Sequence, residues 1–160
     1  LECITAKILE IGGNVEEHDD SLRVWCDKRP SKAVIKTLPY PGFPTDLQAQ
    51  MGVVLATADG TSIINESIWE SRFQYTNELN KMGAQITSQG KSAIFEGVKK
   101  LYGASVYSTD LRAGAALIIA GIAAEGKTEI YNLGHIDRGY ENIEGKFRKL
   151  GANIKRVQEG

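Results

Sequence analysis

The stretch Thr45–Gln50, TDLQAQ, returns later in the chain as Thr109–Gly114, TDLRAG. After each copy the apolar residues follow the spacing of one helix face, and the second series repeats the first 64 positions later. The first series is Leu47, Met51, Val54, Leu55 and Ala58, and the second is Leu111, Ala115, Ile118, Ile119 and Ile122. The sequence therefore predicts two equivalent amphipathic helices, one running to about Ala58 and the other to about Ala124.

The starts of these two helices differ in one informative residue. Thr45 and Thr109 are predicted N-caps, because a hydroxyl oxygen can accept from a free N–H of the first turn. Gln48 would complete a capping box with Thr45. In the second copy the same place holds Arg112, which is unfavourable at the positive end of a helix dipole. We therefore expect an anion close to Arg112.

A second type of helix occurs three times, and each copy ends in a glycine suited to a left-handed C-terminal turn. The three segments are 4–15, 75–86 and 143–154, about 70 positions apart. Together the two patterns predict repeated βαβαββ units with the strongly apolar helices inside and the sheets outside. The chain is expected to be a single α/β domain over 1–160: the second half of one repeat (about 1–36), a full repeat (about 37–104) and most of a third (about 105–160).

Alternating and β-branched segments predict the strands. They are 14–18, 22–26, 33–36, 61–65, 85–87, 92–96, 128–131 and 153–157. Residues 132–139 are expected to form a loop. All 4 prolines lie between positions 30 and 44, so the approach to Thr45 is expected to be stiff.

The composition is that of an ordinary globular domain, with 42% hydrophobic residues, 24% charged residues and a net charge of −1. Lysine and arginine are dispersed, which argues against nucleic acid or an anionic membrane as a partner. No stretch approaches the roughly 18 apolar residues of a membrane span, and the first residues do not resemble a signal peptide. Cys3 and Cys26 form no metal-binding pattern. We therefore expect a cytoplasmic protein with two buried or half-buried free thiols.

Four motifs, in this order, resemble the bacterial UDP-N-acetylglucosamine enolpyruvyl transferases, the 1-carboxyvinyltransferases that begin peptidoglycan synthesis. They are Pro41–Gln50 (PGFPTDLQAQ), Glu70–Phe73 (ESRF), Ser108–Ala113 (STDLRA) and His135–Tyr140 (HIDRGY). The resemblance implies an inside-out α/β barrel and an enzyme of two such domains. This chain would be most of the domain that carries the C-terminal half. The chain also begins within a helical pattern, so we expect a fragment whose partner is the companion domain.

The activity that the resemblance implies is transfer of the enolpyruvyl group of phosphoenolpyruvate to the sugar 3-hydroxyl of UDP-N-acetylglucosamine, with release of phosphate. This step serves cell-wall synthesis, cell shape and cell division, and it needs no metal or other cofactor. A hydroxyl is a poor nucleophile at neutral pH, so a carboxylate should take its proton. Arginines suit the two anionic groups of phosphoenolpyruvate.

The resemblance also implies site residues. Asp46 would contact the sugar hydroxyl and act as the base, and Ile68 would contact the UDP-sugar through its backbone. Arg112 and Arg138 would face phosphoenolpyruvate, with Arg72 and Asp110 lining the same cleft. The family's acid, a cysteine on a mobile loop, and its lysine for phosphoenolpyruvate match neither Cys3 nor Cys26 nor any other segment here. We therefore expect one half-site, unable to turn over alone.

Other interpretations remain open at this stage. Asp46 and Asp110 also suit a simple role at helix N-termini, and Arg112 and Arg138 also suit a solvated surface. The chain could be a non-catalytic domain that binds a nucleotide sugar or a partner protein. The shikimate-using enolpyruvyl transferases lack the Pro41–Gln50 motif, and RNA-phosphate cyclases should be more basic. An incomplete first repeat should leave an open apolar face or strand edge, which favours self-association.

Overall fold

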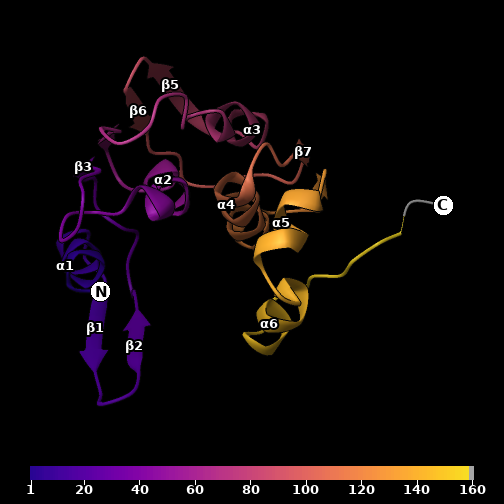
Figure 1. Ribbon diagram of the computed structural model, residues 1–160, viewed down its shortest axis with the longest axis horizontal. Coiled ribbons are helices and arrows are strands. Elements are labelled where there is room, and N and C mark those ends of the chain that lie inside the picture. The colour runs from indigo at the N-terminus through magenta and orange to yellow at the C-terminus, as the bar shows by residue number, and fades with distance from the viewer. Residues whose placement is uncertain (159–160) are drawn as a thin grey trace.

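A computed structural model describes residues 1–158 of the chain (Figure 1). The elements in chain order are α1 (Glu2–Glu10), β1 (Asn14–Glu17), β2 (Leu22–Trp25), β3 (Val34–Lys36), a 3₁₀ turn (Thr45–Leu47), α2 (Gln48–Ala56), β4 (Thr61–Asn65), α3 (Tyr75–Lys81), β5 (Gln85–Gln89), β6 (Ser92–Glu96), β7 (Ser105–Tyr107), α4 (Leu111–Ala123), β8 (Glu129–Tyr131), α5 (Gly134–Gly139) and α6 (Ile143–Lys149). None of the helices in this range is long and apolar enough to cross a bilayer.

The strands of residues 1–158 form three separate sheets. β1 and β2 make an antiparallel hairpin, and β7 pairs with β8 in parallel. The largest sheet has the order β3-β4-β6-β5, with β3 parallel to β4 and the other neighbours antiparallel. Each of the two strands that precede an inner helix, β3 and β7, thus pairs in parallel with the strand that follows that helix, β4 and β8.

The helices α2 and α4 lie inside and pack against each other (Figure 1). Most residues of α2 are buried, and Leu55 and Ala56 are fully enclosed. In β6 the burial alternates, with Ala93 and Phe95 enclosed and Ile94 exposed, so one face of the large sheet covers α2 and the other faces solvent. The expected arrangement of inner helices and outer sheets is therefore present.

The three helices α1, α3 and α6 end in the same way. Each is followed by a glycine at positive φ: Gly12 at 91°, Gly83 at 91° and Gly151 at 95°. The N–H of the next residue returns to a carbonyl in the last turn, as from Ala84 to Leu79 at 3.1 Å. This is the Schellman arrangement, which satisfies carbonyls that the helix leaves free. The repeat boundaries proposed from the sequence stay a prediction.

The predicted threonine N-caps are wrong. Thr45 begins a 3₁₀ turn, and its hydroxyl donates to Glu66 at 2.9 Å rather than accepting from the helix. Gln48 bonds Glu66 and Tyr75, so it forms no capping box. For α4 the cap is Asp110, whose carboxylate accepts from the N–H groups of Arg112 and Ala113. A carboxylate is favoured there over a hydroxyl because it also complements the helix dipole.

Three further expectations differ from the structure. Residues 134–139 form the helix α5 rather than a loop, because Ile136 is buried against α4 despite the two glycines of the segment. Residues 153–157 form no strand, since they pair with no neighbouring strand within the described range. Cys26 is exposed rather than buried or half-buried, while Cys3 is half-buried as expected.

We predict that Gly114→Ala destabilises the chain while Gly121→Ala on the same helix does not. Both substitutions improve helix propensity by about 1 kcal/mol. A Cβ at Gly114 would lie 2.5 Å from Ile136 Cγ1 and 2.7 Å from Ser108 Oγ, whereas at Gly121 the nearest atom is 3.3 Å away. Overpacking of this kind costs roughly 1–3 kcal/mol. Urea unfolding should rank Gly114→Ala below Gly121→Ala, and equal stabilities would contradict the packing described between α4 and α5.

Candidate active site

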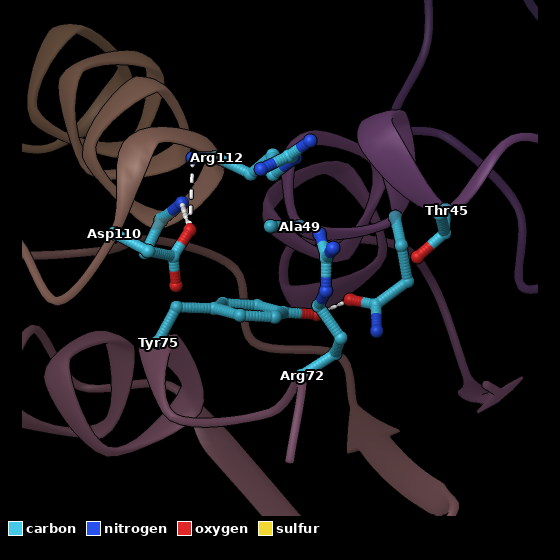
Figure 2. Close-up of a pocket in the computed structure, with 8 residues that line it drawn as sticks. Thr45, Ala49, Arg72, Tyr75, Asp110 and Arg112 are labelled. Atoms are coloured by element: carbon cyan, nitrogen blue, oxygen red, sulfur yellow. Dashed lines mark hydrogen bonds between the residues drawn. The ribbon is translucent and has the colours of Figure 1, made fainter. Parts of the chain in front are cut away.

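The first turns of the two inner helices meet at a small pocket (Figure 2). It brings together residues from α2, the loop after β4, α3 and α4. The lining residues are Thr45, Gln48, Ala49, Arg72, Tyr75, Asp110, Arg112 and Ala113. Three of the six residues expected from the sequence, Arg72, Asp110 and Arg112, thus line one pocket.

Asp46 joins this group through Arg112. The Nε of Arg112 donates to Oδ1 of Asp46 at 2.7 Å, across 66 positions of sequence. The side chain of Asp46 is 64% exposed and that of Arg112 35% exposed, so solvent reaches both groups. The anion expected beside Arg112 is, in this structure, the carboxylate of Asp46. The ion pair links the starts of the two equivalent helices.

Asp110 and Arg72 make different contacts at the pocket: Asp110 bonds the backbone of α4, and Arg72 lies over the Trp69 ring. The carboxylate of Asp110 accepts from the N–H of Arg112 at 2.9 Å and so fixes the backbone that carries the Arg112 side chain. The guanidinium of Arg72 lies 5.3 Å from the centre of the Trp69 ring, a cation–π contact. Figure 2 shows the guanidinium groups of Arg72 and Arg112 beside Ala49 of α2. Two cations therefore border one small space.

Ile68 and Arg138 do not line the pocket. Ile68 is 38% exposed, and its N–H is already bonded to Glu66 at 2.9 Å. The guanidinium of Arg138 contacts its own helix: it donates to the carbonyl of Gly134 at 3.1 Å and lies 3.3 Å from Nδ1 of His135. These two predicted residues therefore sit outside the group formed by Asp46, Arg72, Asp110 and Arg112.

Sequence reasoning missed two buried residues at this site, Glu66 and Tyr75, each 1% exposed. Tyr75 donates to Oε1 of Gln48 at 2.6 Å, and Gln48 in turn donates to Glu66 at 3.3 Å. Burial, with a smaller contribution from the Glu66 charge, raises the pKa of Tyr75, so its hydroxyl stays a donor. A glutamate directly after a regular strand was the one available signal, and it is a weak one.

The pKa of Glu66 is lowered although the group is buried. Burial works to raise it, but the hydroxyls of Thr37 and Thr45 and the N–H groups of Ile68 and Trp69 outweigh that effect. Glu66 is therefore ionised at neutral pH. Within residues 1–158 no group of three or more His, Cys, Asp or Glu side chains is placed to hold a metal ion.

Comparison with known proteins places these features in one family. The family described as EPSP synthase (3-phosphoshikimate 1-carboxyvinyltransferase) matches residues 1–147. The UDP-N-acetylglucosamine 1-carboxyvinyltransferase 3 of Caldanaerobacter subterraneus subsp. tengcongensis is 57% identical over 99% of this chain, and the UDP-N-acetylglucosamine 1-carboxyvinyltransferase of Clostridium botulinum is 59% identical over 98% of it. This chain spans 38% of the length of each relative.

Solved structures agree with the fold. The enolpyruvyl transferase NikO from Streptomyces tendae matches 100% of this chain with a TM-score of 0.91 and 26% identity, over 37% of its own length. An EPSP synthase from Acinetobacter baumannii matches 93% of this chain with a TM-score of 0.68 and 17% identity, over 35% of its own length. The expected α/β fold of the enolpyruvyl transferase type is confirmed.

We predict that the stability of the chain falls on acidification partly through Glu66. Its folded-state pKa lies below the ordinary value of 4.5, so the unfolded chain binds the proton more readily and the stabilisation is lost as pH falls through the folded-state pKa. Each unit of depression corresponds to about 1.4 kcal/mol. Urea unfolding between about pH 6 and pH 3, in roughly 0.5 M salt to screen surface pairs, should show this slope. Glu66→Gln should flatten it, and equal slopes in both proteins would contradict the assignment.

Proposed function

The chain belongs to the EPSP synthase family, and from that membership we propose that it forms one half of the active site of a UDP-N-acetylglucosamine 1-carboxyvinyltransferase. Such an enzyme transfers the enolpyruvyl group of phosphoenolpyruvate to the 3-hydroxyl of UDP-N-acetylglucosamine and releases phosphate. The choice of sugar nucleotide over shikimate phosphate rests on relatives that are 57% and 59% identical and carry that name. The step belongs to peptidoglycan synthesis, and we place it in the cytoplasm, where free thiols such as Cys3 and Cys26 persist.

The observation that carries the proposal is the ion pair between Asp46 and Arg112 at 2.7 Å, beside Arg72. Asp46 serves as the base that takes the proton of the sugar hydroxyl while the hydroxyl oxygen bonds to the enolpyruvyl carbon. Arg112 and Arg72 serve the phosphate and carboxylate of phosphoenolpyruvate, because guanidinium groups match both anions. The proton leaves the hydroxyl for Asp46. The bond between the enolpyruvyl carbon and the phosphate oxygen breaks, and phosphate departs with its electrons.

The ion pair also provides a switch between the unliganded and the loaded site. While Arg112 bonds Asp46, the guanidinium occupies the Oδ1 atom that the sugar hydroxyl would otherwise approach. An incoming phosphate competes for the guanidinium and releases Asp46 toward the sugar. Binding of the anionic substrate thus frees the carboxylate that its partner substrate requires.

The remaining assignments follow from the same proposal. Ile68 contacts the UDP-sugar through backbone groups, and Arg138 approaches phosphoenolpyruvate when the companion domain closes over this face. Asp110 holds the backbone of Arg112. The chain spans 38% of the length of each relative. We assign the acid and a further cation for phosphoenolpyruvate to the companion domain, because neither Cys3 nor Cys26 matches the acid that the family resemblance implies. This chain by itself is therefore not expected to turn over.

A non-catalytic role for the same surface is the second candidate. A domain that only binds a nucleotide sugar needs the backbone contact at Ile68 but no base at Asp46. The two candidates differ in two observables: in the catalytic case Asp46 must contact the sugar hydroxyl, and phosphoenolpyruvate must compete for Arg112.

We predict that UDP-N-acetylglucosamine at millimolar concentration shifts the amide NMR signals of Asp46 and Ile68 in the isolated chain. Asp46→Ala removes the contact to the hydroxyl and should weaken binding about tenfold, or by ~1.4 kcal/mol. Asp20→Ala, an exposed aspartate in the turn between β1 and β2, is the matched control and should bind as the original chain does.

Phosphoenolpyruvate added to the same sample should shift the side-chain signal of Arg112. A phosphate-release assay with both substrates should show no turnover by the isolated chain. Turnover by this chain alone would overturn the half-site proposal. Sugar binding that is indifferent to Asp46→Ala, with no response of Arg112, would favour the non-catalytic role instead.

We also propose that the isolated chain self-associates through the apolar groove between α4 and α6. The groove is lined by Ile119, Ile122, Phe147, Leu150, Gly151 and Ala152. Leu150 is 81% exposed and Ile122 is 44% exposed, which favours contact with a second apolar surface.

Sedimentation at about 0.5 mM should therefore detect a dimer that Ile122→Glu weakens at least about tenfold. Ile94→Glu is the matched control, because Ile94 has the same 44% exposure on the outer face of β6. A chain that stays monomeric, or equal effects of the two substitutions, would contradict the proposal.

A further inference from the structure

Glu66, directly after β4, is the most enclosed ionised group near the pocket, at 1% exposure. Both of its carboxylate oxygens accept several hydrogen bonds. Oε1 accepts from the Thr37 hydroxyl at 2.6 Å, the Ile68 N–H at 2.9 Å and the Trp69 N–H at 3.2 Å. Oε2 accepts from the Thr45 hydroxyl at 2.9 Å and the Gln48 amide at 3.3 Å. Every polar contact of this side chain is thus a donor pointing at an anion.

Three of these five donors belong to the two segments that the proposed function assigns to the sugar nucleotide: the Thr45 hydroxyl and the N–H groups of Ile68 and Trp69. Thr45 immediately precedes Asp46, and Ile68 is the residue whose backbone is expected to contact the UDP-sugar. In the sequence, Thr45 and Asp46 precede α2 and β4, and Ile68 follows them. Neither segment belongs to a regular strand. Glu66 is the group that bonds both of them directly.

The residue directly after β4, Glu66, can be compared with the residue directly after β8, Asn132. The N–H of Thr37 donates to the carbonyl of Asn65 at 3.0 Å, and the N–H of Ser108 donates to the carbonyl of Tyr131 at 3.0 Å, so the two places correspond. Glu66 follows Asn65, whereas Asn132 follows Tyr131. Asn132 is neutral and exposed, and its amide donates to the Ser108 carbonyl at 2.7 Å. The fold therefore needs no buried charge at this junction.

A carboxylate is the group that fits this particular set of donors. Replacing one oxygen by an amide NH₂ would place a donor against donors, because the backbone N–H groups of Ile68 and Trp69 cannot reverse their direction. Gln48 cannot reverse its amide either without losing the bond from Tyr75. Within residues 1–158, none of the ion pairs includes Glu66. A buried charge without a cation is costly, and hydrogen bonds from fixed donors compensate it.

We propose that Glu66 is a positioning residue for substrate binding and proton transfer: its carboxylate holds the Thr45–Asp46 turn and the backbone at Ile68 in one fixed relation. The inference rests on the proposed function for the identity of the substrate. Asp46 then meets the sugar hydroxyl while the backbone at Ile68 holds the nucleotide sugar. A displacement of either segment by about 1 Å is enough to lower the rate by about two orders of magnitude.

The test compares three variants in a chimaera in which this chain replaces the matching segment of a full-length relative. Glu66→Gln should lower kcat for enolpyruvyl transfer at least about tenfold and raise KM for UDP-N-acetylglucosamine, because both segments lose their common acceptor. Thr45→Val removes the hydroxyl that bonds Glu66 next to Asp46. It should therefore lower kcat and leave KM for UDP-N-acetylglucosamine within about twofold.

Ser62→Ala is the matched control. Ser62 is a buried hydroxyl of β4 that accepts from the Ala33 N–H at 3.1 Å and does not contact Glu66. Its loss should lower the melting temperature without changing kcat or KM. A purely structural role for Glu66 would make Glu66→Gln behave like Ser62→Ala, and that result would overturn the proposal.

Two further outcomes are decisive. If Glu66→Gln does not fold, Thr45→Val decides, and full kcat in that variant overturns the proposal. If the original chimaera has no activity, the proposed function fails, and the positioning role is then judged in the isolated chain by NMR. There, Glu66→Gln must shift the amide protons of Asp46, Ile68 and Trp69, and unchanged signals would overturn it.

Discussion

The burial of α2 and α4 against each other is the constraint on which the rest of the structure depends. Both helices are apolar around most of their circumference, so neither can lie on the surface, and each needs cover on several sides. The large sheet covers α2 with one face and leaves its other face in water. The strand β8 contacts α4. The hydrophobic effect thus places the helices inside and the strands outside. The first turns of α2 and α4 meet at the pocket, so its lining residues come from both helices.

The two copies differ where the chemistry is proposed. The first carries Asp46 before its helix, and the second carries Asp110 as a true cap with Arg112 after it. Duplication alone would give two carboxylates of the same role. Instead, Asp110 accepts from the helix N–H groups, whereas Asp46 is 64% exposed and, within residues 1–158, its carboxylate bonds only the Arg112 guanidinium, for which an anion can compete. The same sequence motif therefore yields one structural acid and one available acid.

The sequence was sufficient for the features that depend on local periodicity and glycine geometry. The strand 61–65, the hairpin of β5 and β6, and the glycine ends of α1, α3 and α6 all follow from alternation, helical spacing and positive φ. What it could not predict depends on distant partners. Thr45 suits a cap in isolation, but buried Glu66 offers its hydroxyl a stronger acceptor. Residues 134–139 lack helix propensity, but α4 provides the apolar surface on which α5 forms. The grouping of Arg72, Asp110 and Arg112 came from motifs, while Glu66 and Tyr75 carried no motif at all.

The contrast between Glu66 and Asn132 shows why burial of a charge is informative here. Stability alone favours the neutral solution, because an ion without a cationic partner loses its hydration and recovers only hydrogen bonds. A neutral residue, Asn132, stands at this place in the second copy, where Asp110 caps the start of α4. In the other copy the 3₁₀ turn has no side-chain cap, so the Thr45 hydroxyl needs an acceptor from another segment. Glu66 provides it, and the charge that is costly for folding then fixes the residue next to Asp46, whose carboxylate is exposed.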